Sequence, residues 1–293
     1  MSTNSAREMP TGKVWVITGC SSGFGREIAL AALARGAIVV ATARDPAKLA
    51  DLAAKGAILQ RLDVTDDDAR LAEAIASILA KTDDRIDILV NNAGYILTGA
   101  VEECSRAEVQ ATFNTNVFGQ LNVARAVLPI MRKQKSGTIA NLGSVGGWHG
   151  TPGAGLYCAT KACAAMISEA LRCEVAHLGI RVTCIEPGYF RTSFLAPGHR
   201  VRAEKVIDEL EKGTDATMGA LDALDRQQPG DPAKAAALIV EALTASGRAE
   251  ERDLPPRLIV GRDAYEIVTD NMTSNRANLE LWKDLMTLTD CDD

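Results

Sequence analysis

Seven short apolar runs recur along the chain, and segments of helical composition separate them. The runs occupy residues 14–17, 37–43, 58–64, 86–90, 138–143, 180–186 and 257–261. They are rich in Val, Ile, Leu and Ala, which is typical of strands buried on both faces of a parallel sheet. Alternation of strands with helices predicts an α/β fold, a doubly wound parallel sheet with right-handed crossovers.

The first apolar run ends in a glycine-rich turn, and a helix of residues 26–36 follows it. Glycine lets the backbone approach a phosphate closely, and the free N–H groups at the start of the helix favour negative charge. Many turns need glycine, but a strand before and a helix after it favour a dinucleotide site. The predicted cofactor-binding residues of this turn are Gly19, Ser21, Ser22, Gly23, Phe24 and Gly25.

The second apolar run ends at Ala43 and is followed by Arg44 and Asp45. In a β-α-β unit of this kind, the residue at this strand end meets the ribose of the cofactor. A carboxylate there would accept the ribose hydroxyls of NAD, whereas a guanidinium can bind the 2′-phosphate of NADP. Arg44 therefore predicts NADP(H), with two alternatives: Arg44 is a solvated surface charge, or Asp45 competes as the ribose acceptor.

Candidate catalytic chemistry follows the fifth apolar run, between Ser144 and Lys161. Tyr157 and Lys161 are four residues apart, so on a helix they share one face. A free tyrosine has a pKa of about 10, and a neighbouring cation lowers that pKa toward the working range. Ser144 could hydrogen-bond the oxygen of a carbonyl substrate. The three residues predict carbonyl or alcohol redox chemistry; the bland alternative is that they only cap and pack a helix.

Two further groups of residues are candidates for the cofactor site and the catalytic site. Asn91-Asn92-Ala93-Gly94 leaves the fourth apolar run, where ligands sit in parallel sheets. A helix is predicted over residues 106–131, with Asn114 and Asn116 inside it. Because asparagine is mildly unfavourable within helices, at least one of the two is expected to have a structural or catalytic task.

Residues 189–228, here named the lid segment, mix charged residues with large apolar ones and contain several breaking residues. This pattern predicts a helical lid over the substrate, the alternative being a surface excursion without ligand contact. Candidate residues of an apolar or aromatic substrate pocket are Tyr95, Trp148, His149, Tyr189 and Phe194, each equally compatible with packing. The amphipathic tail, residues 263–293, is expected to pack on the body or on another subunit.

Composition narrows the possible functions. A chain of 293 residues with 47% apolar residues fits one large domain spanning residues 1–293. The net charge of −6 gives no general attraction for nucleic acid or for anionic membranes. Seven scattered cysteines predict reduced thiols in a cytoplasmic protein, with neither a disulfide framework nor a metal site. Cys158 and Cys163 flank the candidate catalytic pair and are expected to pack. No signal peptide or membrane-spanning run is predicted.

Five motifs resemble, in order and spacing, those of the short-chain dehydrogenase/reductase family. They are Thr18-Gly19-x-x-x-Gly23-x-Gly25, Asn91-Asn92-Ala93-Gly94, Ser144, Tyr157-x-x-x-Lys161 and Pro187-Gly188. The resemblance covers residues 12–262 and is greatest to the branch that holds 17β-hydroxysteroid and retinol dehydrogenases, without establishing a steroid substrate.

The resemblance implies a single-domain Rossmann-like fold of about seven strands, a nicotinamide cofactor and a homodimer or homotetramer. It implies a catalytic tetrad in which the tyrosine is the general acid/base, the serine holds the substrate oxygen, the lysine binds ribose and lowers the tyrosine pKa, and the asparagine supports a proton-relay water. These residues are Asn116, Ser144, Tyr157 and Lys161. Further implied cofactor contacts are Asp63, Val64, Asn91, Ala93, Gly94, Pro187, Gly188 and Thr192, besides Tyr157 and Lys161.

The sequence thus predicts an NADP(H)-dependent oxidoreductase that interconverts a small ketone or aldehyde with an alcohol. An alternative of another class is a catalytically silent protein that binds NADP(H) as a sensor or scaffold. Intact Ser144, Tyr157 and Lys161 argue against that alternative, because a sensor needs the glycine turn but not the acid/base pair.

Overall fold

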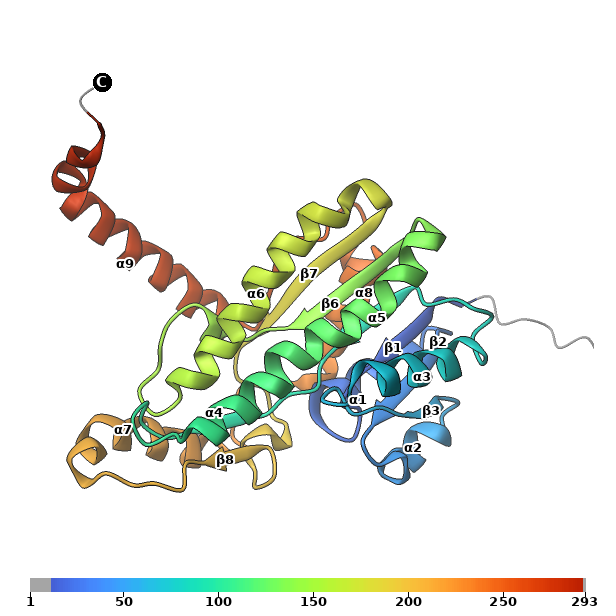
Figure 1. Cartoon of the computed structure of the whole chain (residues 1–293), viewed down its shortest axis with the longest axis horizontal. Coiled ribbons are helices and arrows are strands. Elements are labelled where there is room, and N and C mark those ends of the chain that lie inside the picture. The colour runs from blue at the N-terminus through green and yellow to red at the C-terminus, as the bar shows by residue number, and fades with distance from the viewer. Residues whose placement is uncertain (1–11, 292–293) are drawn as a thin grey trace, which may run out of the picture.

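The computed structural model of the chain describes residues 12–291 (Figure 1). The first residues, for which the sequence predicts no signal peptide, lie outside this range. Seven parallel strands form the central sheet in the order β3-β2-β1-β4-β6-β7-β9. Their bounds are β1 Val14–Ile17, β2 Ile38–Ala43, β3 Ile58–Arg61, β4 Ile88–Asn91, β6 Gly137–Leu142, β7 Ile180–Pro187 and β9 Arg257–Val260. The predicted doubly wound parallel sheet is confirmed.

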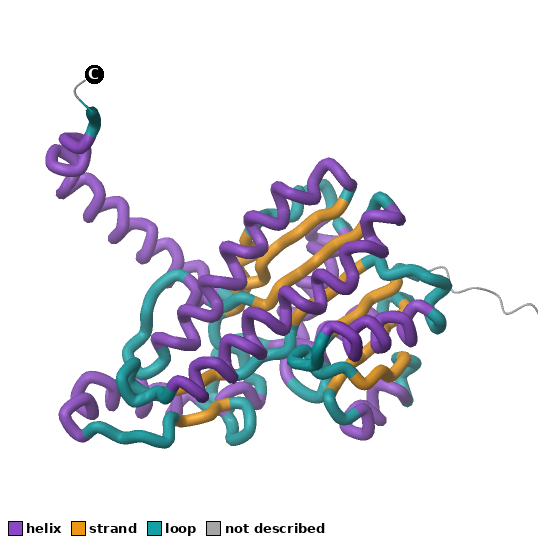
Figure 2. The backbone as a smooth tube through the Cα atoms, viewed as in Figure 1, coloured by secondary structure: helices purple, strands orange, loops and turns teal. Residues whose placement is uncertain are grey.

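Helices cover both faces of this sheet, as the tube drawing in Figure 2 shows. Their bounds are α1 Gly23–Leu33, α2 Ala50–Ala53, α3 Asp68–Leu79, α4 Arg106–Phe113, α5 Gly119–Gln134, α6 Gly155–Val175, α7 Asp208–Leu224, α8 Pro232–Thr244 and α9 Arg262–Met286. Within the described chain, none of these helices has the length and apolar composition needed to cross a bilayer.

Alternate residues of the strands supply two separate cores, because successive side chains of a strand point to opposite faces. On one face, Trp15 and Ile17 of β1 pack with the apolar sides of α1 and α8. On the other, Val16 packs with residues of α3 and α5. The order of strands reverses between β1 and β4, so the crevice at their carboxyl ends lies at the topological switch point, where ligands bind in such sheets.

The helix predicted over residues 106–131 is not one continuous α-helix. The structure divides it into α4, a π-helical turn η2 at Asn114–Phe118, and α5. A π-turn inserts an extra residue into the hydrogen-bond ladder and is frequent at functional sites. The prediction missed this turn because the local composition favours helix throughout residues 106–131. Composition does not distinguish α-helical from π-helical hydrogen bonding.

The lid segment is only partly helical. Besides α7 it contains the short strand β8, Arg200–Arg202, which pairs in parallel with β5, Ile96–Thr98, outside the main sheet. Two carboxylates, one before α4 and one within it, hold the backbone of the lid segment. Glu103 Oε1 accepts from Ile207 N, and Glu108 Oε1 accepts from Glu204 N, each at 2.9 Å. The segment is therefore anchored to the body of the protein beside the carboxyl edge of the sheet.

Candidate active site

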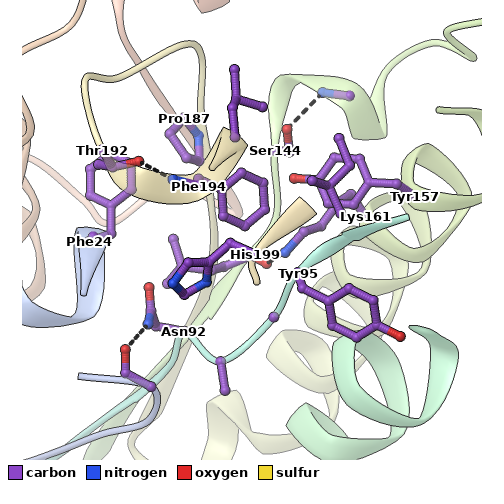
Figure 3. A pocket seen from close by; sticks show the side chains of 18 of the residues that line it. Phe24, Asn92, Tyr95, Ser144, Tyr157, Lys161, Pro187, Thr192, Phe194 and His199 are labelled. Atoms are coloured by element: carbon purple, nitrogen blue, oxygen red, sulfur yellow. Dashed lines mark hydrogen bonds between the residues drawn. The ribbon is translucent and has the colours of Figure 1, made fainter. Parts of the chain in front are cut away.

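A cleft of about 460 Å³ opens at the carboxyl ends of the strands. Its walls come from the glycine turn, the ends of β2, β4, β6 and β7, the start of α6, and the lid segment (Figure 3). This volume lies within the range of small-molecule and cofactor sites.

The glycine turn presents bare backbone to the cleft at Gly19 and Gly23. Gly19 and Gly23 adopt positive φ angles of 70° and 57°, which other residues rarely adopt. A Cβ on Gly25 would lie 2.6 Å from the carbonyl oxygen of Gly19, so only glycine fits there. Asn92 Nδ2 donates to the carbonyls of Thr18 and Gly19 at 2.8 and 3.0 Å. Asn92 therefore fastens the turn to the end of β4.

Arg44 lies at the end of β2 and lines the cleft, whereas Asp45 does not line it. The Asp45 carboxylate instead caps the following 3-10 turn, where its Oδ1 accepts from Ala47 N at 3.1 Å. Asp63 is similarly engaged with Thr65, whose N and Oγ1 donate to Asp63 Oδ1 at 3.0 and 2.8 Å. Of the neighbours Arg44 and Asp45, therefore, only Arg44 lines the cleft.

His199 of the lid segment is a cleft residue that no sequence motif indicates. Its Nε2 lies 3.0 Å from Oγ of Ser22 at the first turn of α1. Burial, and next the charges of Arg44 and Lys48, lower the pKa of His199. Figure 3 shows the imidazole in the middle of the cleft, near Asn92. The lid segment thus reaches the glycine turn through His199, and its Phe190 also packs edge-on against Phe24, with 5.1 Å between the ring centres.

Ser144, Tyr157 and Lys161 converge on one wall of the cleft. Ser144 begins the turn after β6, and its Oγ accepts from Gly146 N at 3.0 Å. In Figure 3 the Tyr157 hydroxyl is directed toward Ser144. The ammonium of Lys161 lies 5.8 Å from the centre of the Tyr157 ring and donates to the carbonyl of Leu142 at 2.7 Å. Tyr157 and Lys161 both lie in α6, four residues apart, as the predicted sharing of one helix face requires.

The direction of the Tyr157 pKa differs from the expectation. Burial raises the pKa of Tyr157 well above its usual value, and the hydrogen bond with Ser144 lowers it only in part. Burial also lowers the pKa of Lys161 to about 8. Desolvation is the largest cause of both shifts, and at neutral pH the phenol keeps its proton and the ammonium keeps its charge.

Asn116 lies in the π-turn η2, fully buried behind the cleft wall. Its Oδ1 accepts from Tyr95 N at 3.1 Å, and its Nδ2 donates to Tyr95 O at 2.8 Å and to Thr160 Oγ1 at 3.2 Å. A Cβ on Gly94 would stand 3.0 Å from Asn116 Oδ1 and 3.8 Å from the Lys161 ammonium. Asn116 thus fixes the backbone after β4, and its amide and the Lys161 ammonium both lie beside Gly94.

Four predicted residues do not line the cleft: Asn116, which lies behind its wall, and three others. Asn91 points inward, where its Nδ2 donates to Asn141 Oδ1 at 2.9 Å and to Gln120 O at 3.1 Å. Gly25 lies behind the turn, packed on Gly19 and Asn92. Trp148 turns away, because its indole Nε1 donates to the buried Glu186 at 2.7 Å and its ring stacks on Arg257. Asn92, of the predicted Asn91-Asn92-Ala93-Gly94 group, does line the cleft, and so do Ile96 and His199, which were not predicted.

Most other predicted residues do line the cleft. They are Gly19, Ser21, Ser22, Gly23, Phe24, Arg44, Asp63, Val64, Ala93, Gly94, Tyr95, His149, Pro187, Gly188, Tyr189, Thr192 and Phe194. Only part of the Tyr95 side chain faces the cleft. Its hydroxyl points away and accepts from Thr112 Oγ1 at 3.0 Å (Figure 3). Among residues 12–291, no cluster of His, Cys, Asp or Glu is arranged to hold a metal ion.

Comparison with known proteins agrees with this architecture. The family model for short chain dehydrogenases matches residues 13–202, well over half of the chain. The chain belongs to the short-chain dehydrogenase family. The oxidoreductase BOA17 of Botryotinia fuckeliana is 37% identical to this short-chain dehydrogenase over 281 residues, covering 93% of this chain and 97% of its own.

Solved structures resemble this short-chain dehydrogenase along nearly its whole length. A short-chain dehydrogenase from Streptomyces avermitilis shares 40% identity at a TM-score of 0.85, covering 95% of this chain and 100% of its own. One from Burkholderia phymatum in complex with NAD shares 27% identity at a TM-score of 0.74, over 88% and 92% of the two chains. A serine dehydrogenase complexed with NADP⁺ shares 28% identity at a TM-score of 0.68, covering 84% of this chain and 94% of its own. Structural neighbours of this oxidoreductase therefore bind either nicotinamide cofactor.

Proposed function

We propose that this protein is an NADP(H)-dependent oxidoreductase that interconverts a ketone or aldehyde with an alcohol, with Tyr157 as the general acid/base. The observation that carries the proposal is the convergence of Ser144, Tyr157 and the buried Lys161 on the wall of the cleft. A nicotinamide dinucleotide fits the opposite end, where the bare backbone of Gly19 and Gly23 can approach a pyrophosphate. When bound, NADPH supplies the hydride that reduces the carbonyl carbon.

The residues of the chain divide the proton chemistry among them. The Ser144 hydroxyl donates a hydrogen bond to the substrate oxygen as negative charge develops there. Tyr157 holds its proton at neutral pH, because burial raises its pKa, and delivers that proton to the same oxygen. The charge of Lys161, whose pKa is about 8, favours the phenolate that results. The protonated phenol suits reduction at neutral pH.

Replacing Tyr157 by Phe tests the role of the phenol. The ring is retained, so the 6.0 Å ring contact with Phe194 and the binding of NADPH should persist. Turnover of an active carbonyl substrate, found by screening for NADPH oxidation, should fall by about 10²–10⁴-fold, the usual contribution of a general acid. Near-normal turnover by the variant would refute the assignment. Tight NADPH binding with persistent inactivity of the wild type would instead favour a sensor.

Replacing Arg44 by Ala tests the choice of cofactor. Loss of a charge-assisted phosphate contact should cost about 1.5–3 kcal/mol in NADPH binding and leave NADH binding nearly unchanged. Asp45→Ala is the matched control, since Asp45 caps a turn and does not line the cleft. Equal effects of Arg44→Ala on both cofactors, or a selective loss of NADH binding in Asp45→Ala, would contradict the NADP preference.

The substrate end of the cleft supports a small apolar or aromatic carbonyl compound. Phe194 and Tyr189 come from the lid segment, and Ile96 from β5, so aromatic and aliphatic side chains surround Tyr157. We further infer a cytoplasmic location, which the odd number of free, scattered cysteines supports. A homo-oligomer remains part of the proposal, as the family resemblance implies.

A further inference from the structure

The C-terminal helix α9 leaves the body of the protein after its first two turns (Figure 1). Ala264 and Val268 are buried against the turn after Ser144 and the end of β9. Beyond Val268 no residue of α9 is buried. A helix of this length that projects alone has only its own hydrogen bonds to stabilise it, and in proteins most helical stability comes from packing of an apolar face.

The projecting part of α9 carries large apolar side chains that are more than half exposed. Met272 and Leu279 are each 58% exposed, Trp282 54% and Met286 52%. Soluble monomers rarely expose contiguous apolar surface of this kind, and where they do it marks an interaction site.

These side chains recur with alternating spacings of three and four residues. The residues of this stripe, here named the α9 seam, are Tyr265, Val268, Met272, Asn275, Leu279, Trp282 and Met286. Their mean spacing of 3.5 residues is that of a coiled coil, whereas a helix lying on a globular core follows 3.6. The α9 seam begins at the body of the protein, where Val268 is buried. Its later residues extend past the body and have no partner among the described residues.

We propose that the α9 seam pairs with the α9 seam of a second copy of this chain, as a parallel two-stranded coiled coil. The parallel arrangement sets Asn275 against Asn275 of the other copy, so its amide is paired across the seam; an antiparallel one would set it against an apolar residue. This contact does not depend on the proposed oxidoreductase activity.

Area and charge favour a second copy over a membrane. A large apolar or aromatic side chain carries roughly 150–250 Å², so the exposed seam offers on the order of 600 Å² per copy, near the ≈ 800 Å² per partner of a stable interface. Within α9, five acidic side chains outnumber three basic ones. Helices that lie on anionic membranes are rich in Lys and Arg on their polar face, so the charge of α9 disfavours that occupant.

The test uses the full-length protein and measures its mass by sedimentation velocity and light scattering. Leu279→Asp places a charge in the seam and should halve the mass of the assembly, with at least a tenfold rise in its dissociation constant. Leu281→Asp is the matched control: this residue lies on the opposite face of α9 and is 73% exposed. Circular dichroism and thermal melting should show that both variants remain folded, because Leu279 and Leu281 are both exposed.

Cross-linking tests the direction of the pair. In a background with the exposed Cys173 and Cys291 replaced by Ser, Asn275→Cys should form a disulfide with itself in a second copy under mild oxidation. The proposal is overturned if the wild type is a monomer, if Leu279→Asp leaves the mass unchanged, or if Leu281→Asp dissociates the assembly equally. Vesicle binding that Leu279→Asp abolishes without a change of mass would assign the seam to a membrane instead. Absence of the Asn275→Cys cross-link would overturn the parallel arrangement.

Discussion

The buried carboxylate Glu186 makes the cost of removing Arg257 unusually large. Glu186 lies at the end of β7 with no exposure to solvent. Arg257 of β9 donates to it through Nη2 and Nε, at 2.7 and 2.9 Å to Oε1. Trp148 Nε1 donates to Oε2 at 2.7 Å, and the guanidinium of Arg257 lies 3.9 Å from the centre of the Trp148 ring. One ion pair thus holds the turn after Ser144 to the sheet.

Arg257→Met keeps most of the side-chain volume but leaves a carboxylate buried without its counter-charge. Breaking a buried pair in this way costs about 3–5 kcal/mol, because the remaining charge cannot return to water. An exposed pair offers the comparison: Arg61 is 52% exposed and contacts Asp66 at 2.8 Å, and losing such a pair costs far less because water screens both charges. Adding Glu186→Gln to Arg257→Met removes the orphaned charge and keeps an acceptor for Trp148, so it should recover much of the lost stability.

Urea unfolding of the wild type, Arg257→Met, Arg61→Ala and the double variant measures these free energies. The order expected is wild type, Arg61→Ala, double variant and Arg257→Met, from most to least stable. A loss of under 1 kcal/mol in Arg257→Met, or a double variant no more stable than that single variant, would refute the role given to the ion pair. Because Trp148 follows the turn that begins at Ser144, kcat should fall more than cofactor affinity in Arg257→Met.

Two further predictions concern the cofactor turn and the buried lysine. Gly25→Ala places a Cβ 2.6 Å from Gly19 O and should weaken NADPH binding by about 1–3 kcal/mol in a titration, whereas Gly213→Ala, with no atom within 4 Å, should leave it unchanged. Lys161 has a folded pKa of about 8 against 10.5, so the unfolded chain binds more protons between these values. The wild type should therefore gain stability over Lys161→Met, by up to about 3 kcal/mol, as the pH rises from 8 toward 10.5. A flat difference in unfolding free energy across that window would contradict the depressed pKa.

Local patterns predicted the sheet and most helices because their physical causes are local. Continuous apolar runs of Val and Ile mark strands buried on both faces, and Asp231 followed by Pro232 marks the start of α8, where Asp231 Oδ1 accepts from Ala233 N at 2.9 Å. The three-residue strands β5 and β8 gave no comparable signal, since their pairing depends on chain segments about a hundred residues apart.

The unpredicted parts of the site depend on distant contacts. His199 and Ser22 are 177 residues apart in sequence, and no pattern around either indicates the other. Trp148 was placed in the substrate pocket from its position in the turn after Ser144; a buried acceptor on β7, 38 residues later, turns it away. The π-turn at Asn114–Phe118 was missed for the opposite reason, because a single inserted residue leaves local composition unchanged.

Burial has opposite consequences for the two central side chains of the cleft. It raises the pKa of Tyr157 and lowers that of Lys161 to about 8. Each shift favours the neutral form of the group. A phenol that keeps its proton is ready to donate it, while an ammonium that is costly to bury retains its charge only because pH 7 lies below its lowered pKa. Stability and function therefore make opposite demands on Lys161. Its desolvated charge destabilises the fold near neutral pH, but the same charge favours the Tyr157 phenolate during the reaction. On this reasoning, carbonyl reduction should weaken as the pH rises through about 8, since Lys161 then loses the charge that favours release of the Tyr157 proton.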